Sequence, residues 1–452
     1  MLNWVFIPEL YSKIPGRERG RRKEWRLWRK ERKLELTRTG FFCTTLNMVV
    51  GIVGAAGYAG VELVRILSPH PAVDTLALAS VSRRGQDIRE LYPNFLGPLS
   101  RREKFGAGTM ESPEETIDRS DIVFGALPAG TGEPYAKACL DRGISYIDLS
   151  ADFRFDEDQE TYTAWYGLSW QYPALHHRSV YGLPELNRDL IKTLAARGPV
   201  IIGNPGCFPT VISLAAYPAV CHRAGKAPPC AVQGKGTAPS RGDPPVLAPG
   251  STLIADAVSG VTGAGRELAR AYHFPECSDS VSSYKVGVHR HTPEISRNLM
   301  KMAGKAVPVV FTPHLGPLNR GILATVYIPL DSPAVPDLSG AGESPGKPSP
   351  DGPPKEGRVE KEKALREWYA EFYRDEPFVR ILPSGVNAAT GRVRQSNFCD
   401  ISVHLDQSGT MLILESAIDN MVKGAAGQAV QNMNIICGFE ETQGLEALPA
   451  LF

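Results

Sequence analysis

The sequence predicts an α/β protein: a doubly wound parallel sheet of the Rossmann type, followed by an α+β domain whose sheet is mostly antiparallel. Between residues 48 and 200, apolar strand-like runs alternate with helical segments, which is the pattern of a parallel sheet covered by helices. Strand-like runs in residues 201–418 have few helices between them. A chain of 452 residues is also long enough to bury two cores.

The first domain is expected to begin with a buried strand at 49–53, a glycine-rich turn and a helix, because apolar residues recur at helical spacing through 61–67. Later strands of this domain are expected at 74–81, 121–126, 144–148 and 199–202. In the second domain, the expected strands are 252–259, 283–288, 307–311 and 321–328. Pro308 marks the third of these as an edge strand or a strand start, because proline cannot donate a ladder hydrogen bond.

Three segments fall outside this pattern. Residues 222–250 and 332–357 are rich in Pro, Gly and Ser and are expected to be loop inserts. Residues 1–47 carry twelve Lys/Arg against five Asp/Glu and have no core pattern, so we expect them to be disordered. They could form a surface-binding amphipathic arm, a targeting peptide, or an extension upstream of a natural start at Met48. The last is favoured, because glutamates throughout the segment and the lack of an apolar core argue against targeting.

Composition excludes several classes of function. Hydrophobic content of 42% and charged content of 22% are those of a soluble globular protein, and no apolar run approaches the roughly 20 residues that span a bilayer. The net charge of the whole chain is +1, so the part after the basic extension is acidic, which argues against nucleic acid as a partner. The eight cysteines form no CxxC pair, which indicates reduced thiols in the cytoplasm.

A glycine-rich turn follows the first strand, in the series GIVGAAGYAG of residues 51–60. Glycine lets the backbone approach a pyrophosphate, whose charge the helix N-terminus then stabilises. The alternative is a tight turn without a ligand, but the strand–turn–helix context favours a dinucleotide site. The candidate cofactor-binding residues in this turn are Gly54, Ala56, Gly57, Tyr58, Ala59 and Gly60.

The end of the second strand indicates which dinucleotide binds. An NAD site places Asp or Glu there, about 20 residues after the glycines, to bind the ribose hydroxyl. This chain has Ser82, Arg83 and Arg84 at that point, and hydroxyl and guanidinium groups suit a 2′-phosphate. NADP is therefore the expected cofactor, the alternative being a solvated arginine pair in a surface loop.

Cys207 is the candidate nucleophile. It lies in the series GNPGCFPT of residues 203–210, between an apolar strand and a helical run, and Pro209 suits the first turn of that helix. A thiol at a helix N-terminus is expected to have a lowered pKa, and nearby amides can hold an oxyanion. A buried structural cysteine in a tight turn is the alternative.

A base is needed beside such a thiol, and His289 or His291 can supply it. Both lie in the series HRHTPE of residues 289–294, which we expect to end a strand before a helix capped by Thr292, with Pro293 in its first turn. Two histidines at this spacing can bind a metal, but no companion ligands with zinc spacing accompany them. We therefore expect no metal, and expect one histidine to serve packing while the other acts on the thiol.

These series together resemble the N-acetyl-gamma-glutamyl-phosphate reductase family, which is related to aspartate-semialdehyde dehydrogenase. The resemblance runs from Met48 to about Phe439. Any one block would be suggestive alone, and their common order makes the resemblance specific. Besides the glycine turn and the GNPGC and HRHTPE series, the matching blocks are DLSADFR (148–154), YGLPEL (181–186), SGVTGAGR (259–266) and DNMVKGAAGQAVQN (419–432).

The resemblance implies both the reaction and its residues. Cys207 would attack N-acetyl-γ-glutamyl phosphate, expel phosphate and form a thioester, which NADPH would reduce to N-acetylglutamate 5-semialdehyde in arginine biosynthesis. His289 would move the thiol proton, with His291 as the second candidate. Residues 419–440 would return to the first domain, and the second domain would form a homodimer or homotetramer. Further cofactor contacts are implied at Ser259, Gly260, Gly263 and Asn397, and substrate contacts at Arg154, Glu185, Asn204 and Arg266.

Other functions explain part of the same pattern. Reductases of carrier-bound aminoadipyl or glutamyl phosphate share the chemistry but need a basic groove for an acidic carrier protein, so dependence on a carrier would identify them. Aspartyl phosphate fits the cysteine context and the HRHTPE series less well. A non-catalytic dinucleotide-binding module explains the glycine turn but leaves Cys207 and His289 without a role. The basic extension and the two inserts depart from the family pattern, and the first insert lies between nucleophile and base.

Overall fold

The computed structural model describes residues 48–97, 108–156, 158–221, 247–248, 250–330 and 356–451. The basic extension 1–47 and almost all of the inserts 222–250 and 332–357 lie outside these residues, so the expectations about them stay predictions. Among the helices of the described residues, none is long and apolar enough to cross a membrane.

The first sheet has six parallel strands in the order β2-β1-β3-β4-β6-β5. Strand order reverses at β1, which is where a doubly wound sheet opens a crevice at the carboxyl ends of its strands. β1 is buried along nearly its whole length, as expected for a parallel strand covered on both faces. The strands are β1 (Met48–Val53), β2 (Val73–Ala79), β3 (Ile122–Gly125), β4 (Ser145–Asp148), β5 (Ser179–Tyr181) and β6 (Ile201–Gly203).

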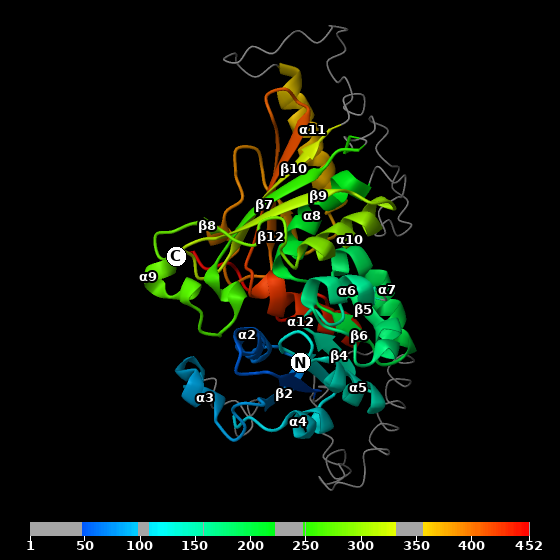
Figure 1. Ribbon diagram of the computed structural model, residues 1–452, viewed down its shortest axis with the longest axis vertical. Helices are drawn as coiled ribbons and strands as arrows, with labels where there is room; N and C mark the ends of the chain where they lie inside the picture. Colours follow the sequence, from blue (N-terminus) through cyan, green and yellow to red (C-terminus); the bar gives the residue numbers. More distant parts are fainter. Residues whose placement is uncertain are drawn as a thin grey trace, which may run out of the picture. The chain divides into compact units, whose positions relative to one another are not determined.

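Helices cover this sheet and connect its strands. One of them, α12, comes from the end of the chain and packs on α7, α2 and β4; Figure 1 shows it (red) between the two sheets. The Rossmann-type part of the fold prediction is confirmed. The helices are α2 (Tyr58–Leu67), α3 (Ile88–Leu91), α4 (Pro113–Arg119), α5 (Glu133–Asp141), α6 (Gln159–Tyr166), α7 (Pro184–Arg197) and α12 (Gly427–Cys437).

The second sheet has seven strands in the order β11-β12-β13-β10-β7-β9-β8. Two pairs, β11–β12 and β7–β9, are parallel and the other four are antiparallel, so the sheet is mixed and mostly antiparallel, as predicted. β10 alternates buried and half-buried residues, because one face packs on helices. The strands are β7 (Leu253–Ser259), β8 (Ser282–Ser283), β9 (Val309–Leu315), β10 (Ile322–Pro329), β11 (Val379–Ile381), β12 (Cys399–Leu405) and β13 (Met411–Ile418).

A second core forms where this sheet meets its helices. Its buried residues come from α8, from the inward-facing positions of the sheet, and from the helices α10 and α11. α8 is buried along nearly its whole length, so the helix that begins at Cys207 is held from all sides. The helices of this part are α8 (Cys207–Cys221), α9 (Phe274–Cys277), α10 (Thr292–Ala303) and α11 (Glu356–Phe372).

Two local predictions are wrong. The strand expected at 283–288 is reduced to β8, because Lys285 (φ 46°) and Gly287 (φ 72°) adopt left-handed conformations that break an extended chain. The HRHTPE series therefore follows a turn rather than a strand. Thr292 is the first residue of α10 and not its cap; the cap position is His291, without a side-chain capping bond.

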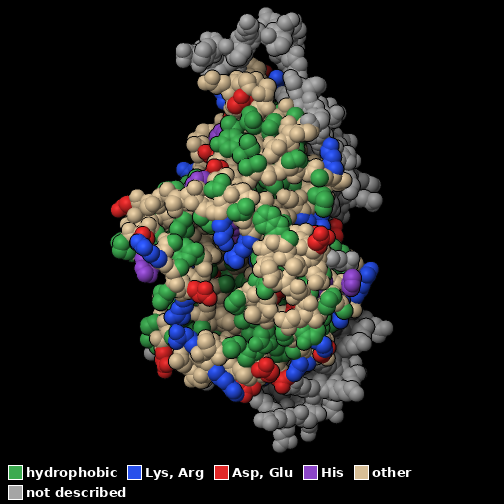
Figure 2. All heavy atoms as spheres, viewed as in Figure 1, with side chains coloured by type: hydrophobic (Ala, Val, Ile, Leu, Met, Phe, Trp, Pro, Cys, Tyr) green, Lys and Arg blue, Asp and Glu red, His purple; other side chains and the backbone are tan. Residues whose placement is uncertain are grey.

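A surface segment precedes this turn. No residue from 263 to 288 is buried, and Leu268 and Phe274 are 95% and 79% exposed. Figure 2 shows hydrophobic side chains on the surface around α9, in the middle of this segment. Exposed apolar side chains gathered in one place are typical of a surface that another molecule covers.

Candidate functional site

The glycine turn is built so that only glycine fits at its key positions. Gly54 has φ +92°, and a Cβ there would lie 2.2 Å from the carbonyl oxygen of Ala126. A Cβ on Gly60 would lie 2.2 Å from the carbonyl oxygen of Gly54. The amides of Gly54 and Ala55 both donate to Ala79 O at 3.0 Å, which ties the turn to the end of β2.

The turn leads directly into α2. Gly57 occupies the cap position, Tyr58 and Ala59 open the helix, and Ala56 precedes them. The first turn of a helix leaves amide donors without intrahelical partners, and its dipole favours an anion there. These residues therefore fit the pyrophosphate of a dinucleotide.

The two arginines after β2, Arg83 and Arg84, differ in the hydrogen bonds that they make to other side chains. Arg84 Nη2 donates to both carboxylate oxygens of Glu115, at 3.0 and 3.2 Å. Arg83 Nη1 makes a single bond to Gln86 Oε1 at 3.2 Å, and Ser82 beside it is exposed. Arg83 therefore makes fewer hydrogen bonds to other side chains than Arg84 does.

Arg266 lies at the glycine turn. Its Nη1 donates to Ala56 O at 3.1 Å and to the Tyr92 hydroxyl at 3.2 Å, and its Cζ lies 5.4 Å from the centroid of the Tyr92 ring. Burial raises the pKa of Tyr92, whereas Arg266 and Arg83 lower it, so both cations face this phenol. Arg266, which was expected to contact the substrate, therefore lies beside the candidate cofactor-binding residues of the glycine turn.

The segment that carries Arg266 begins at the end of β7. The Gly260 amide donates to Gly321 O at 2.9 Å, and a Cβ on Gly260 would lie 2.8 Å from Asn319. A Cβ built on Gly263 would lie 3.5 Å from the side-chain nitrogen of Asn420 and 3.6 Å from the hydroxyl oxygen of Ser259. These candidates are therefore held against the residues that follow β13.

Cys207 opens α8 directly after β6 and a turn of three residues. Its position at the helix start is as expected, but its pKa is not. Burial raises the pKa of Cys207 to about 11, although the Phe208 amide and Arg154 act to lower it. The prediction that the helix terminus gives a lowered pKa is wrong, because the cost of burying a thiolate exceeds what the helix end supplies.

Glu294 is the important residue that the sequence did not single out. Its buried carboxylate accepts the Gly206 amide (2.9 Å) and the Tyr181 hydroxyl (2.8 Å) on Oε1, and lies 3.4 Å from Arg154 Nη1 through Oε2. It therefore holds the residue just before the nucleophile. The available signal was its place in the first turn of α10, three residues after His291.

Arg154 and Asn204 lie beside Cys207, and their polar groups hold the nucleophile turn. Arg154 Nε donates to Asn204 O at 2.8 Å, and its Nη2 donates to Leu149 O at 2.9 Å. Asn204 Nδ2 donates to Ala425 O at 3.0 Å. Both of these substrate candidates thus position the backbone that presents the thiol.

His289 and His291 are both buried and pack around Phe208, with ring centroids 5.6 and 5.9 Å from it. Nδ1 of His289 accepts the His291 amide at 3.1 Å. Nε2 of His291 faces Gly206, where a built Cβ would lie only 2.7 Å away. Burial, with Arg290 and Lys285, lowers the pKa of His289 to about 4. Burial and then His289 hold the pKa of His291 well below 6.5, so both rings are neutral at pH 7.

Comparison of this chain with known proteins identifies its relatives. The profile of the semialdehyde dehydrogenase NAD-binding domain matches residues 49–194, and that of the semialdehyde dehydrogenase dimerisation domain matches residues 244–343 and 355–420. Relatives named N-acetyl-gamma-glutamyl-phosphate reductase are 41% identical over 403 residues in Clostridium kluyveri and 42% over 404 in Clostridium beijerinckii. Each comparison covers 89% of this chain and 99% of the relative.

The chain belongs to the N-acetyl-gamma-glutamyl-phosphate reductase family. Solved structures of more distant proteins share the fold. Aspartate semialdehyde dehydrogenase II of Vibrio cholerae superposes with a TM-score of 0.57 at 15% identity, over 87% of this chain and 98% of that one. The Candida albicans aspartate semialdehyde dehydrogenase with NADP gives 0.55 at 14% identity, over 86% and 98%.

Two further site candidates of this reductase-family chain, Glu185 and Asn397, lie in a buried polar cluster. Glu185 Oε1 accepts from Lys423 Nζ at 2.6 Å, and both side chains are fully buried. Lys423 Nζ also donates to Gln431 Oε1, which accepts from Asn397 Nδ2 at 3.2 Å. The cluster adjoins the nucleophile through the residue after Lys423: a Cβ on Gly424 would lie 2.7 Å from the Cβ of Cys207.

No three His, Cys, Asp or Glu side chains of the described residues come together as a metal site. His289 and His291 are instead packed among aromatic rings.

Proposed function

We propose that this chain reduces N-acetyl-γ-glutamyl phosphate to N-acetylglutamate 5-semialdehyde with NADPH, releasing phosphate, as a step of arginine biosynthesis. The observation that carries this proposal is the nucleophile turn. Cys207 starts a buried helix, Glu294 holds the amide of Gly206, and two neutral imidazoles lie beside this turn. The names of the relatives at about 40% identity supply the substrate.

In this mechanism Cys207 Sγ attacks the acyl carbon, the bond from that carbon to the phosphate oxygen breaks, and inorganic phosphate leaves a thioester on the enzyme. When bound at the glycine turn, NADPH supplies the hydride that reduces the thioester carbonyl. Amides at the start of α8 can stabilise the oxyanion in both steps. The tetrahedral adduct then collapses, releases the aldehyde and restores Cys207.

The thiol needs a base in its attack. A group with a pKa of about 11 is almost entirely protonated at pH 7, so the proton must leave as the carbon–sulfur bond forms. A neutral imidazole can take it, and burial keeps both His289 and His291 neutral. We therefore propose general-base activation within the substrate complex instead of a standing thiolate.

The reverse reaction provides the direct test. N-acetylglutamate 5-semialdehyde with inorganic phosphate and NADP should give NADPH, at a rate that depends on phosphate. Turnover with this free substrate, in the absence of any carrier protein, supports the proposal. Turnover that requires a carrier-bound substrate would favour the related carrier-dependent reductases, and binding of NADP without turnover would favour a non-catalytic module.

NADP preference is proposed to rest on Arg83. Arg83→Ala should raise the KM for NADP by roughly 10- to 150-fold, since losing a charge-assisted contact to phosphate costs about 1.5–3 kcal/mol. The KM for NAD should stay nearly constant, because NAD lacks the 2′-phosphate. Arg84→Ala should have a smaller effect, because Glu115 already engages Arg84. Steady-state kinetics with both cofactors make this comparison, and equal losses for NADP and NAD would refute it.

Arg266 supplies the control for that experiment. Because its guanidinium lies at the glycine turn, we propose that it contacts the part that NADP and NAD share. Arg266→Gln should therefore weaken both cofactors alike and leave the KM for the semialdehyde unchanged. Arg270→Gln, in the same exposed segment and paired with Glu276, should change neither. If only the KM for the semialdehyde rises, Arg266 contacts the substrate, as the family resemblance implies, and not the cofactor.

The exposed apolar segment 263–288 suits an interface between copies of this chain. We propose a homodimer or homotetramer in which the exposed apolar segment 263–288 is covered by a second copy of the chain. The profile described as a dimerisation domain spans this segment. We also propose that the protein acts in the cytoplasm, because its eight cysteines lack paired spacing.

A further inference from the structure

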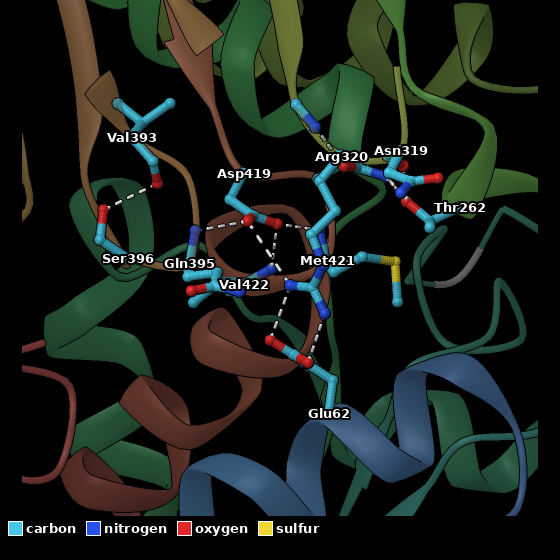
Figure 3. A network of polar contacts seen from close by, with 12 residues as sticks. Glu62, Thr262, Asn319, Arg320, Val393, Gln395, Ser396, Asp419, Met421 and Val422 are labelled. Atoms are coloured by element: carbon cyan, nitrogen blue, oxygen red, sulfur yellow. Dashed lines mark hydrogen bonds and ion pairs between the residues drawn. The ribbon is translucent and has the colours of Figure 1, made fainter. Parts of the chain in front are cut away.

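Arg320 joins the second sheet to the helix α2, which follows the glycine turn. It lies in the turn between β9 and β10, and its guanidinium reaches Glu62 of α2 (Figure 3). Nη1 donates to Glu62 Oε1 at 2.8 Å and Nη2 to Oε2 at 2.6 Å. This paired contact joins the second sheet to the helix whose N-terminus forms the dinucleotide turn.

The contact is an ion pair that is partly removed from water. The Glu62 side chain is 3% exposed and that of Arg320 is 22% exposed. Burial raises the pKa of Glu62, but hydrogen bonds from Arg320 and Arg65 outweigh it and leave that pKa lowered. Glu62 is therefore ionised at neutral pH, and a two-pronged arginine–carboxylate pair fixes direction as well as distance.

The same guanidinium approaches the segment behind the nucleophile. Nη1 of Arg320 lies 3.5 Å from Asp419 Oδ2, which also accepts the Gln395 amide at 2.7 Å. Oδ1 of Asp419 accepts the amides of Met421 and Val422 at 2.8 and 3.2 Å (Figure 3). The carbonyl of Asp419 accepts the Gly424 amide at 3.0 Å, and Gly424 is the residue packed against Cys207.

The backbone on both sides of Arg320 is held as well. Asn319 O accepts from the Thr262 hydroxyl at 2.6 Å, and the Gly321 amide donates to Asn420 Oδ1 at 2.7 Å. The guanidinium therefore projects from an anchored turn. Because this turn is fixed, the guanidinium can hold Glu62 and Asp419 at set positions relative to the second sheet.

We infer that Arg320 is a positioning residue that sets the distance between the cofactor helix α2 and the Asp419–Gly424 segment behind Cys207. The inference rests on the proposed function, in which a hydride must pass between a dinucleotide bound at α2 and a carbon attached to Cys207. Reacting atoms must approach within about 3–3.5 Å, and a misplacement of about 1 Å can cost on the order of 10²-fold in rate. Arg320 acts on this geometry without touching the reacting atoms.

Arg65 offers a matched control. Its Nε and Nη2 bind Oε1 of the same Glu62 carboxylate, at 3.1 and 2.8 Å, but from within α2 itself. A loss of Arg65 removes a cation from Glu62 without releasing α2 from the second sheet. If Arg320 merely stabilises Glu62 or the helix, the two arginines should be equivalent.

The test is the first turnover of the reverse reaction, followed as the rapid formation of NADPH from the semialdehyde, with a deuterated aldehyde to confirm that hydride transfer limits it. Arg320→Gln should slow this step on the order of 10²-fold, with an unchanged Kd for NADP and an unchanged alkylation rate of Cys207. Arg65→Gln should leave the step at its wild-type rate. Arg320→Lys, which keeps the charge without the fork, should restore part of the rate and serves if the glutamine variant does not fold.

Three outcomes would overturn the inference: equal slowing in the Arg65 and Arg320 variants, a lowered melting temperature with hydride transfer unchanged, or a loss confined to the Kd for NADP. The proposed function fails separately. If the wild-type protein forms no NADPH from the semialdehyde and phosphate, the reaction assignment is wrong and the inference falls with it. If only the Arg320 comparison fails, the reaction assignment stands.

Discussion

Replacing Cys207 with serine should lower phosphate-dependent NADP reduction by roughly 10⁴-fold or more, the scale on which enzymes lose activity with their nucleophile. Serine keeps the size of the side chain, but its hydroxyl is far less acidic and less nucleophilic than a thiol. The Kd for NADP should be unchanged, because the glycine turn leads into α2 whereas the thiol lies at the start of α8. Stopped-flow measurement of NADPH formation and fluorescence titration of the cofactor measure the two quantities.

A second cysteine gives the control. Cys277 lies in the exposed segment around α9, and Cys277→Ser should keep the wild-type rate. Near wild-type turnover of Cys207→Ser would show that the nucleophile is another residue.

The raised pKa of Cys207 predicts a pH dependence of its alkylation. The rate of its reaction with iodoacetamide should keep rising with pH past the usual thiol pKa of about 8.5, towards a midpoint of about 11.

Much of the first sheet followed from local chemistry. Gly60 was predictable from sequence, because the carbonyl oxygen that excludes a Cβ there belongs to Gly54 in the same turn. The carbonyl oxygen that excludes a Cβ on Gly54 belongs to Ala126, which only the fold brings close. The alternation of strands and helices also predicts a parallel sheet with little help from distant residues. The mostly antiparallel class of the second sheet was predicted, but one of its strands was not. The positive φ of Lys285 breaks the segment expected to be a strand, although its composition resembles one.

The contacts that hold the site could not be predicted in the same way. Glu294 meets Gly206 across 88 positions of sequence, and Arg320 meets Glu62 across 258. No spacing rule connects residues so far apart, because the fold alone brings them together. The prediction of a lowered Cys207 pKa failed for a related reason: a helix N-terminus can be recognised in sequence, whereas the burial that outweighs it cannot.

The two histidines differ in what their neutral rings can do. The His291 amide donates to Nδ1 of His289, so neutral His289 carries its proton on Nε2 and can only donate there. His291 turns Nε2 towards Gly206, and its Nδ1 has no hydrogen-bond partner among the described residues. The family resemblance implied His289 as the base, with His291 as the second candidate. Because of this hydrogen bond we propose the reverse assignment, in which His291 takes the thiol proton and His289 donates a hydrogen bond to the carbonyl oxygen of the bound substrate.

Substitution by glutamine separates these roles, because its amide nitrogen can replace an Nε2–H donor but cannot act as a base. His291→Gln should lower kcat/KM by roughly 10²- to 10⁴-fold, whereas His289→Gln should keep much of the activity that His289→Ala loses, about 10²- to 10³-fold. A base works when neutral, so activity persists above its pKa and falls as pH drops through it. Because the pKa of His291 lies well below 6.5, this acid limb of kcat/KM should appear well below pH 6.5. The limb should remain in the His289 variants and vanish in His291→Gln. If it vanishes in His289→Gln and remains in His291→Gln, His289 is the base.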